Sequence, residues 1–320
     1  MRPEVVSHAD WGTNPKKRVA AVARLLADGR YRVEVPARVG RTGSLREQLG
    51  VTSAEPGTTL LGFDFPIGIP AAYAERAGII SFRSALAQFG TGDWESFYEV
   101  AETPSEITPH RPFFPYSCTR KGTCSRKDLT SRLGFSWDEL YRRCERKTET
   151  RAAASPLFWT LGGKQVGKAA ICGWRDFVRP LLGEGSHVGL WPFDGDLVDL
   201  LGSRSCVIAE TYPAEFYRHL DVRFPGGKGG GKRSQIARAT AGRQLLVEAE
   251  RLRIQISDAA SRAIKDGFGP GGDGEDDFDA MVGLIGMLKH LDEGTHLDAP
   301  SDPAIRSVEG WILGQGPAAG

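Results

Sequence analysis

The chain has 320 residues, of which 40% are hydrophobic and 25% are charged. These proportions are ordinary for a globular protein and exclude a fibrous or globally disordered chain, and the length suits one enlarged domain or two small ones. The formal net charge is only +1, so attraction to nucleic acid cannot come from the total charge and requires local basic patches.

The first 70 residues predict most of a sheet. Three extended segments, Val5–Trp11, Arg18–Leu26 and Tyr31–Val39, are separated by turn-rich stretches, and Asp28-Gly29 is a hairpin signal. We therefore expect an antiparallel meander that opens an α/β sheet. A short helix is expected at Leu45–Leu49, and the segment TTLLGFDFPIGIP, residues 58–70, indicates a buried strand in the middle of the sheet that runs into a proline-rich loop.

The pattern changes over residues 71–202, where short aromatic-rich stretches are broken by Pro and Gly. This range predicts a large, mostly helical or irregular insertion or cap. Within it we expect helices at Ser81–Leu86, Trp137–Glu145 and Lys168–Leu182.

Regular alternation returns after residue 202. The segment RSCVIAETYP, residues 204–213, predicts a strand, and a long helix is expected at Ser234–Ala263. A final helix covers FDAMVGLIGMLKHL, residues 278–291, with Asp276 as its N-cap. We expect residues 1–70 and 203–320 to form one α/β core, around the insertion of residues 71–202.

Three acids stand at or near the ends of predicted strands. Asp10, Asp64 and Glu210 each lie in an apolar context, where a charged side chain costs several kcal/mol unless it is paired or bound to metal. Strand ends are also where sites collect in α/β folds. The alternative for each acid is a cap, a turn or a salt bridge, and for Glu210 this alternative has equal weight.

The last helix adds Asp276 and Asp279, which are three residues apart and so share one helix face. Together with the strand acids they suit a two-metal site, in which carboxylates hold Mg²⁺ or Mn²⁺ ions that activate water at a phosphodiester. The sequence therefore predicts that Asp10, Asp64, Asp276 and Asp279 are metal ligands, and that these four acids and Glu210 form the catalytic set.

These residues resemble a large prokaryotic family of predicted nucleases with an RNase H-like fold, long catalogued as a domain of unknown function. The resemblance covers most of the chain, and its motifs are specific only together: SHADWGTNPKKR, GFDFPIGIP, KQVGKAAICGW, GLWPFDG, AETYPAEFYRHL, KRSQIARATAGRQLL, EDDFDAM and EGWILG. It implies an RNase H-like mixed sheet flanked by helices and a metal-dependent nuclease, a function that rests on fold analogy for the family itself.

Position by position, the resemblance places the family's first-strand acid at Asp10 and the acid of its Asp-Phe-Pro-Ile-Gly segment at Asp64. The final helical acids fall at Asp276 and Asp279, and the acid before the Tyr-Pro step at Glu210. The helical pair is similar to the final-helix arrangement of Holliday-junction resolvases. The insertion has no counterpart in the simplest RNase H.

Two short basic segments lie near the predicted site. We expect them to bind phosphates of DNA or RNA without reading sequence, and their alternative is a solvated turn or loop. The residues are Lys16, Lys17, Arg18, Lys228, Lys232 and Arg233. Gly226, Gly231 and Lys232 also have the spacing of a nucleotide-binding P-loop, but Arg233 stands where Ser or Thr should bind Mg²⁺.

The insertion contains residue types of two further kinds of ligand site. Cys118, Cys124, Cys144 and His110 suggest zinc, although the Cys-x5-Cys spacing fits no common zinc pattern. For Trp159, Trp174 and Trp191, core packing is favoured over stacking on bases.

Two other functions remain as alternatives. One is an actin-like or sugar-kinase-type phosphotransferase, which would need a glycine-rich turn where TNPKKR is lysine-rich; the other is a non-catalytic nucleic-acid-binding module. Five cysteines are too few for a disulfide scaffold, and no apolar segment suits a signal peptide or a membrane span. We therefore expect a cytoplasmic protein without a membrane partner, and the sequence carries no signal of oligomeric state.

Overall fold

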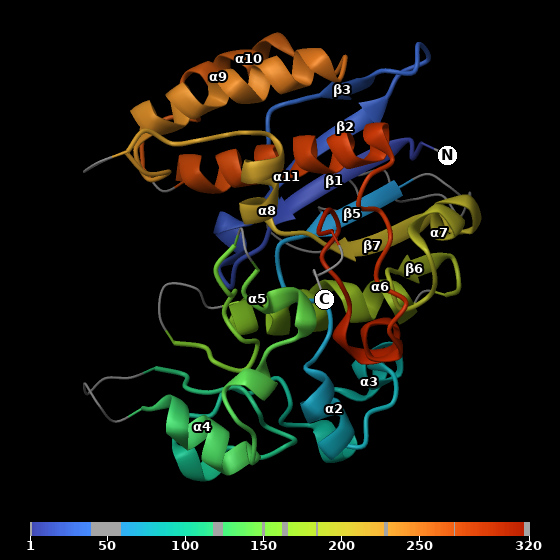
Figure 1. Cartoon of the computed structure of the whole chain (residues 1–320), viewed down its shortest axis with the longest axis vertical. Coiled ribbons are helices and arrows are strands. Elements are labelled where there is room, and N and C mark those ends of the chain that lie inside the picture. Colours follow the sequence, from blue (N-terminus) through green and yellow to red (C-terminus); the bar gives the residue numbers. More distant parts are fainter. Residues whose placement is uncertain are drawn as a thin grey trace.

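The computed structural model describes residues 2–39, 59–117, 124–148, 151–161, 166–183, 185–226, 230–271 and 273–316. At its centre lies a mixed eight-stranded sheet with the strand order β6-β7-β5-β1-β2-β3-β8, and β4 pairs with β2 beside this path (Figure 1). The protein is therefore an α/β protein, as predicted. The helix expected at Leu45–Leu49 lies outside the described residues.

The antiparallel part of the sheet is the predicted meander. It consists of β1 (Val5–Asp10), β2 (Val19–Leu25) and β3 (Tyr31–Val33), and the turn between β2 and β3 contains Gly29 with φ +79°. The third predicted strand is shorter than expected, because β3 ends before Pro36 and a separate strand, β4 (Ala37–Arg38), follows. Proline has no N–H to donate, so it interrupts a ladder at this point.

The parallel part of the sheet consists of β5 (Thr59–Phe63), β7 (Cys206–Glu210) and the edge strand β6 (Val188–Leu190). Strand β5 pairs with both β1 and β7, which confirms the prediction that these three strands are neighbours in one sheet. Strand β6 lies within the range 71–202, and the following helix α7 (Leu197–Ser203) ends one residue beyond it, so this range also contributes an edge to the core sheet.

Alternate residues of the central strands face two different layers of helices. Val6, Leu60 and Val207 pack against the helices α8 (Pro213–His219), α9 (Gln235–Arg251), α10 (Asp258–Lys265) and α11 (Asp273–Glu293). We call this side of the sheet the α11 face. Ala9 and Phe63 point to the other side, the insertion face, where they pack in a cluster that includes Phe65, Trp174 and Phe177. Side chains alternate between the two faces along each strand, so the position of a strand-end acid decides which face its side chain takes.

The insertion lies below the sheet in Figure 1 and is built from short helices. They are α2 (Ala71–Arg76), α3 (Phe82–Gln88), α4 (Arg126–Leu133), α5 (Val166–Gly173) and α6 (Arg179–Gly183), with the shorter turns η2 (Gly92–Trp94) and η3 (Pro104–Glu106). The π-helical turn η7 (Ile305–Glu309) belongs to the C-terminal segment. The predicted helix at Ser81–Leu86 is confirmed as α3, with the Ser81 side chain accepting a hydrogen bond from the Ser84 N–H. The predicted helix at Lys168–Leu182 is confirmed too, and a π-helical turn, η6 (Trp174–Val178), joins α5 to α6.

The prediction of a helix at Trp137–Glu145 is wrong. Two 3₁₀ turns occupy this segment, η4 (Asp138–Leu140) and η5 (Arg143–Glu145), because the backbone of Tyr141 and Arg142 is extended. The extended step carries the Arg142 side chain into the interior, where it meets buried carboxylates. Tertiary ion pairing thus overrides local helix propensity here.

The long helix predicted at Ser234–Ala263 begins as expected, with the Ser234 side chain capping α9, but it is not continuous. It stops at Arg251, and residues Gln255–Ile256 form β8, which pairs with β3 at the edge of the sheet. The Ser257 side chain then accepts a hydrogen bond from the Ala260 N–H and starts α10. Pairing along β3 and a second cap together break the helical pattern.

Core packing is confirmed for two of the three tryptophans. Trp174 and Trp191 are fully buried, and the Trp174 Nε1–H donates to the Pro66 carbonyl at 2.7 Å; Trp159 is partly buried against the same insertion-face cluster. Within the described ranges, no helix has the length and apolar character that a membrane crossing requires.

Candidate metal centre

Asp10 and Asp64 lie side by side at the carboxyl ends of two adjacent parallel strands. The register pairs Ala9 of β1 with Phe63 of β5, so the next residue of each strand is an aspartate. Both aspartates fall on the α11 face, two residues beyond His8 and Gly62, which contact α11. The Trp11 N–H donates to Asp64 Oδ1 at 2.8 Å and fixes this carboxylate at the end of the sheet.

Helix α11 brings two more acids to the same place. A Cβ added at Gly283 would lie 2.3 Å from the His8 ring, so the helix crosses β1 in close contact. Asp279 is about one helical turn before Gly283, and Asp276 about one turn further, which carries both past the end of β1. The helix begins at Asp273, so Asp276 lies in its first turn and is not the N-cap that the sequence predicted.

The four aspartates act on one another electrostatically. Burial raises the pKa of Asp10 well above its ordinary value, and the charges of Asp64, Asp279 and Asp276 raise it further. Burial also raises the pKa of Asp64 to about 7, with an added contribution from Asp279 that the Trp11 N–H and Lys232 oppose. Asp64, Asp276 and Asp279 therefore lie within electrostatic range of Asp10. Like charges held together in this way favour a bound cation.

The acids have basic partners from segments that are distant in sequence. The Lys232 Nζ lies 2.6 Å from Asp279 Oδ2 and 3.1 Å from Glu275 Oε1, and the Tyr217 hydroxyl donates to Asp279 Oδ1. The Arg38 guanidinium lies 3.8 Å from an oxygen of Asp276. Burial raises the pKa of Asp276 to about 6, and the positive charges of Arg38 and Lys17 oppose this rise. Arg38, Tyr217 and Glu275 were not predicted from the sequence; of the three, only Glu275 had a signal, since it precedes Asp276 in the acidic run.

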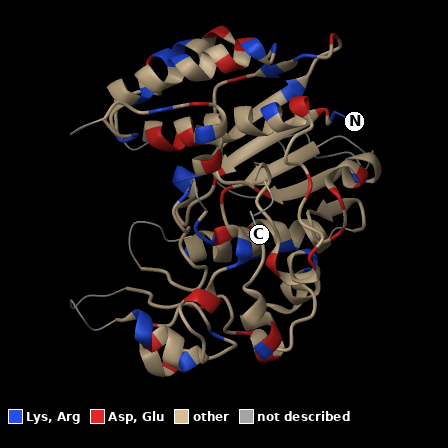
Figure 2. Cartoon of the chain, viewed as in Figure 1, with Lys and Arg blue, Asp and Glu red and all other residues tan. Residues whose placement is uncertain are grey.

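The acidic end of α11 can be followed in the two cartoons. In Figure 2, acidic residues mark the N-terminal end of α11, and the arrowhead of β1 points toward the same side of the molecule (Figure 1). Contacts between α11 and β1 confirm that the two elements pack together. The candidate site therefore lies at the junction of the sheet's carboxyl edge with the start of α11.

The donor set suits a divalent cation in its chemistry. All four predicted ligands supply carboxylate oxygens, which Mg²⁺ and Mn²⁺ prefer. Burial and mutual repulsion disfavour the charged form of these carboxylates, and a bound cation would offset both effects. Within the described ranges, no group of three or more His, Cys, Asp or Glu side chains is already arranged around a single ion position. Lys232 supplies the positive charge in this arrangement instead.

Glu210 is not brought into this cluster. Its strand partner in the register is Phe63, and both side chains lie on the insertion face, the opposite side from Asp10 and Asp64. Arg142 donates to both carboxylate oxygens at 2.7 Å, and the Ile67 N–H donates to Oε2 at 2.6 Å. The prediction of a metal-site role is therefore corrected: Glu210 is a buried ion-pair partner, since strand alternation turns it away from the other acids.

Arg142 is the centre of a buried network that was not predicted from the sequence. It is fully buried, donates to Glu145 at 2.9 Å and to the Glu309 carbonyl at 3.0 Å, and so joins the insertion, strand β7 and the C-terminal segment. No spacing in the sequence relates these residues, since Arg142 and Glu210 are 68 positions apart.

The basic residues after Asp10 separate into two kinds. Lys16 and Lys17 are exposed in the turn η1 (Pro15–Lys17), which Asn14 caps. Arg18 is only 3% exposed: it donates to the Gly12 carbonyl, lies over the Trp11 ring at 4.3 Å and is 3.6 Å from Asp176. The predicted phosphate-binding role of Arg18 is corrected, because its guanidinium holds the chain together after β1.

The remaining predicted basic and metal residues are less tightly placed. Arg233 is exposed and follows Lys232 directly in the chain. Lys232 contacts the acids, and this contact takes the place of a P-loop role. Lys228 lies outside the described residues.

For the zinc alternative, Cys144 is buried, His110 packs against Trp94 at 4.5 Å between ring centres, and Cys118 lies outside the described residues. In the part of the chain that the structure describes, no zinc-ligand group forms, and the Cys124 thiol donates to the Ser117 carbonyl at 3.7 Å.

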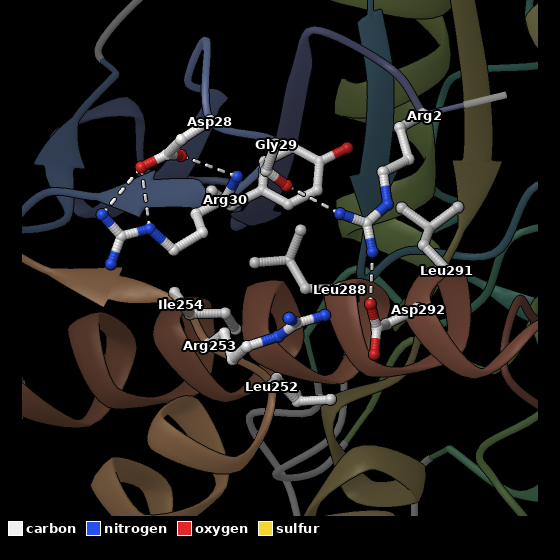
Figure 3. Close-up of a pocket in the computed structure, with 11 residues that line it drawn as sticks. Arg2, Asp28, Gly29, Arg30, Leu252, Arg253, Ile254, Leu288, Leu291 and Asp292 are labelled. Atoms are coloured by element: carbon white, nitrogen blue, oxygen red, sulfur yellow. Dashed lines mark hydrogen bonds and ion pairs between the residues drawn. The ribbon is translucent and has the colours of Figure 1, made fainter.

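A hollow lies at the other end of α11, between the β2–β3 turn and the α9–β8 turn (Figure 3). Its volume is about 300 Å³, and its floor includes Ile254 and Leu288. Both acids that line it are paired, Asp28 with Arg30 and Asp292 with Arg2. Because these carboxylates already have guanidinium partners, the acidic cluster at the start of α11 is the better candidate for a cation.

The raised pKa of Asp64 predicts a pH dependence of stability in metal-free protein. The ordinary value is 3.8 and the folded value about 7, so between these pH values the unfolded chain releases this proton more readily than the folded one. Stability therefore falls as the pH rises through this window. We expect Asp64→Asn, which keeps the acceptor for the Trp11 N–H, to be more stable than the parent by on the order of 2 kcal/mol at pH 8. Thermal unfolding at pH 4 and pH 8 without metal measures this; an equal difference at both pH values would contradict it.

Two strands and one helix thus bring four aspartates to the α11 face of the sheet, and the exposed Lys17 of η1 is near enough to act on Asp276. Comparisons of the chain with protein-family models, with curated proteins and with solved structures found no match.

Proposed function

We propose that this protein is a metal-dependent nuclease that hydrolyses phosphodiester bonds of nucleic acid on an RNase H-like core. The observation that carries the proposal is the electrostatic coupling of Asp10, Asp64, Asp276 and Asp279 at one end of the sheet. The mixed sheet with helices on both faces supports the RNase H-like part of the proposal. The resemblance of the motifs around these acids supports the reaction class.

In this proposal the four aspartates hold Mg²⁺ or Mn²⁺. When bound, such an ion supplies an activated water and stabilises the charge of the leaving oxygen. The chain's own contribution is to orient the ligands: the Trp11 N–H fixes Asp64, and the Tyr217 hydroxyl fixes Asp279. Fixed carboxylates reduce the cost of assembling the site around substrate.

Nucleic acid would approach over the basic residues beside the acids. Lys16 and Lys17 are exposed on η1, and Arg233 is exposed at the start of α9. Lys17 is close enough to the site that its charge lowers the pKa of Asp276. Lysine and arginine at such positions bind phosphates and set the register of the backbone without reading bases.

Removal of these charges has an expected signature in salt dependence. Each phosphate contact contributes about one unit to the slope of log affinity against log salt concentration. We expect the double variant Lys16→Gln, Lys17→Gln to bind all sequences more weakly with a slope that is shallower by roughly 1 to 2. Fluorescence anisotropy with labelled oligonucleotides at several salt concentrations measures this, with Lys127→Gln on α4 as the matched control. An unchanged slope in the double variant contradicts the assignment.

The proposal is tested with purified protein, Mg²⁺ or Mn²⁺, and labelled single-stranded, duplex, hybrid and branched substrates. Metal-dependent cleavage of one of these substrates, lost with a chelator, is the expected result. Cleavage of none of them under any metal condition would overturn the proposal.

One observation favours a second candidate, a non-catalytic nucleic-acid-binding module. Lys232 already neutralises Asp279 and Glu275 in the structure, as a purely structural ion pair would. In that case the substrates of the same panel bind with the salt dependence given above, but divalent metal changes neither their binding nor their integrity.

A further inference from the structure

Lys232 occupies the side of Asp279 that a metal ion would need. Both oxygens of this carboxylate have partners within the chain: the Tyr217 hydroxyl donates to Oδ1, and the Lys232 ammonium lies 2.6 Å from Oδ2. Tyrosine brings no charge, so it can stay when a cation binds. The ammonium carries a positive charge and competes directly with a cation for the same oxygen.

The backbone of Lys232 is anchored independently of its side chain. Arg238 is fully buried and donates to the Lys232 carbonyl at 2.7 Å, while its other nitrogens donate to the carbonyls of Gly267 and Gly269. Two residues further on, the Ser234 side chain caps α9. The position of the Lys232 Cα is therefore fixed by the helix start and by Arg238, and not by the contact with Asp279.

The Lys232 side chain can therefore move without unfolding its surroundings. It is 42% exposed, and it reaches Asp279 from a segment that is 47 residues away in sequence. Four methylene groups connect its ammonium to the anchored backbone, so the ammonium can turn from the carboxylates toward solvent. Arg233, the next residue, is exposed and adds a second positive charge to this part of the surface.

We infer that Lys232 is a counter-ion that a divalent metal displaces from Asp279, and that the released ammonium then binds a phosphate of the nucleic acid. The inference rests on the proposed function for its second half, and on the geometry of Lys232, Asp279 and Tyr217 for its first half. One side chain thereby couples the two binding events. Metal binding strengthens nucleic-acid binding, and by linkage nucleic acid strengthens metal binding by the same factor.

The first arm of the test uses Mn²⁺ alone, without nucleic acid. Isothermal titration calorimetry compares the parent protein with Lys232→Gln, Lys232→Arg and, as the matched control, Arg233→Gln. We expect Lys232→Gln to bind Mn²⁺ roughly tenfold more tightly, because its competitor for Asp279 is gone, and the two other variants to resemble the parent. Metal-free Lys232→Gln should also melt at a lower temperature and recover when Mn²⁺ is added, which separates lost charge balance from misfolding.

The second arm measures binding of a labelled phosphorothioate oligonucleotide with and without Mn²⁺. In the parent protein and in Lys232→Arg, Mn²⁺ should tighten this binding, and in Lys232→Gln the gain should shrink several-fold. Unchanged or weaker Mn²⁺ binding in Lys232→Gln overturns the displacement, and an undiminished gain overturns the phosphate contact. A parent protein that binds Mn²⁺ but cleaves no nucleic acid defeats the nuclease proposal while leaving the displacement intact.

Discussion

Asp10→Asn is expected to reduce metal-dependent hydrolysis by about a thousandfold or more, equivalent to roughly 4 kcal/mol of barrier. Asp10 stands at the end of β1, and its carboxyl group is coupled to Asp64, Asp276 and Asp279. An amide retains the shape of the side chain but removes the negative charge that would bind the cation. The comparison is the initial cleavage rate at saturating Mg²⁺ for the variant and the parent.

The same substitution should leave the fold intact. Asparagine at position 10 relieves repulsion among the four acids, so the metal-free variant is expected to melt at a temperature equal to or above that of the parent. Asp93→Asn, an exposed aspartate of the insertion, serves as the matched control with parental activity. Full cleavage by a double variant with Asn at both Asp10 and Asp64 is incompatible with the proposed site.

The second large effect is expected at Arg142, in the buried network. Arg142→Met keeps most of the volume but leaves the carboxylates of Glu145 and Glu210 without their guanidinium partner. Loss of one partner from a buried ion pair typically costs about 3 to 5 kcal/mol. Since whole domains are stable by only about 5 to 15 kcal/mol, we expect a large fall in the free energy of unfolding, measured with urea.

The variant Glu210→Gln separates this structural role from a role in metal binding, and Arg146→Ala is an exposed control for the loss of stability. Glu210→Gln should lose stability yet bind Mn²⁺ as the parent does, because Glu210 faces Arg142 on the insertion face. Arg146→Ala removes an exposed salt bridge to Asp138, in which the two charged groups lie 3.5 Å apart and the Asp138 side chain is 76% exposed. This variant should change the free energy of unfolding by less than about 1 kcal/mol. Weaker Mn²⁺ binding by Glu210→Gln would return Glu210 to the metal site, contrary to its place in the structure.

The sequence alone located the strands that carry the candidate site. Apolar runs of strand length predicted β1, β5 and β7 as neighbours, because buried strands of a sheet must be apolar on both faces. A charged side chain within such a run has a high energetic cost, so the sequence itself distinguishes Asp10 and Asp64 from the many acids of the surface. The helical spacing of Asp276 and Asp279 identified the third element in the same way.

Helix boundaries were less well determined where tertiary contacts compete with local propensity. The segment Trp137–Glu145 has a helical pattern, yet an extended step places Arg142 among buried acids. The pattern of Ser234–Ala263 is also helical, yet Gln255–Ile256 completes the sheet beside β3. In both segments the competing interaction comes from residues far along the chain, which local periodicity does not register.

The sequence by itself therefore determined that this is an α/β protein with acids at the ends of its central strands, because burial patterns are local properties of the chain. Only the tertiary structure decided which face each acid occupies and which charge opposes it. Glu210 follows an apolar run just as Asp64 does, but its register against Phe63 turns it toward Arg142. Lys232 meets Asp279 across 47 residues because α9 and α11 pack on the same face of the sheet. Register and packing are relations between distant segments, and a pattern along one segment does not contain them.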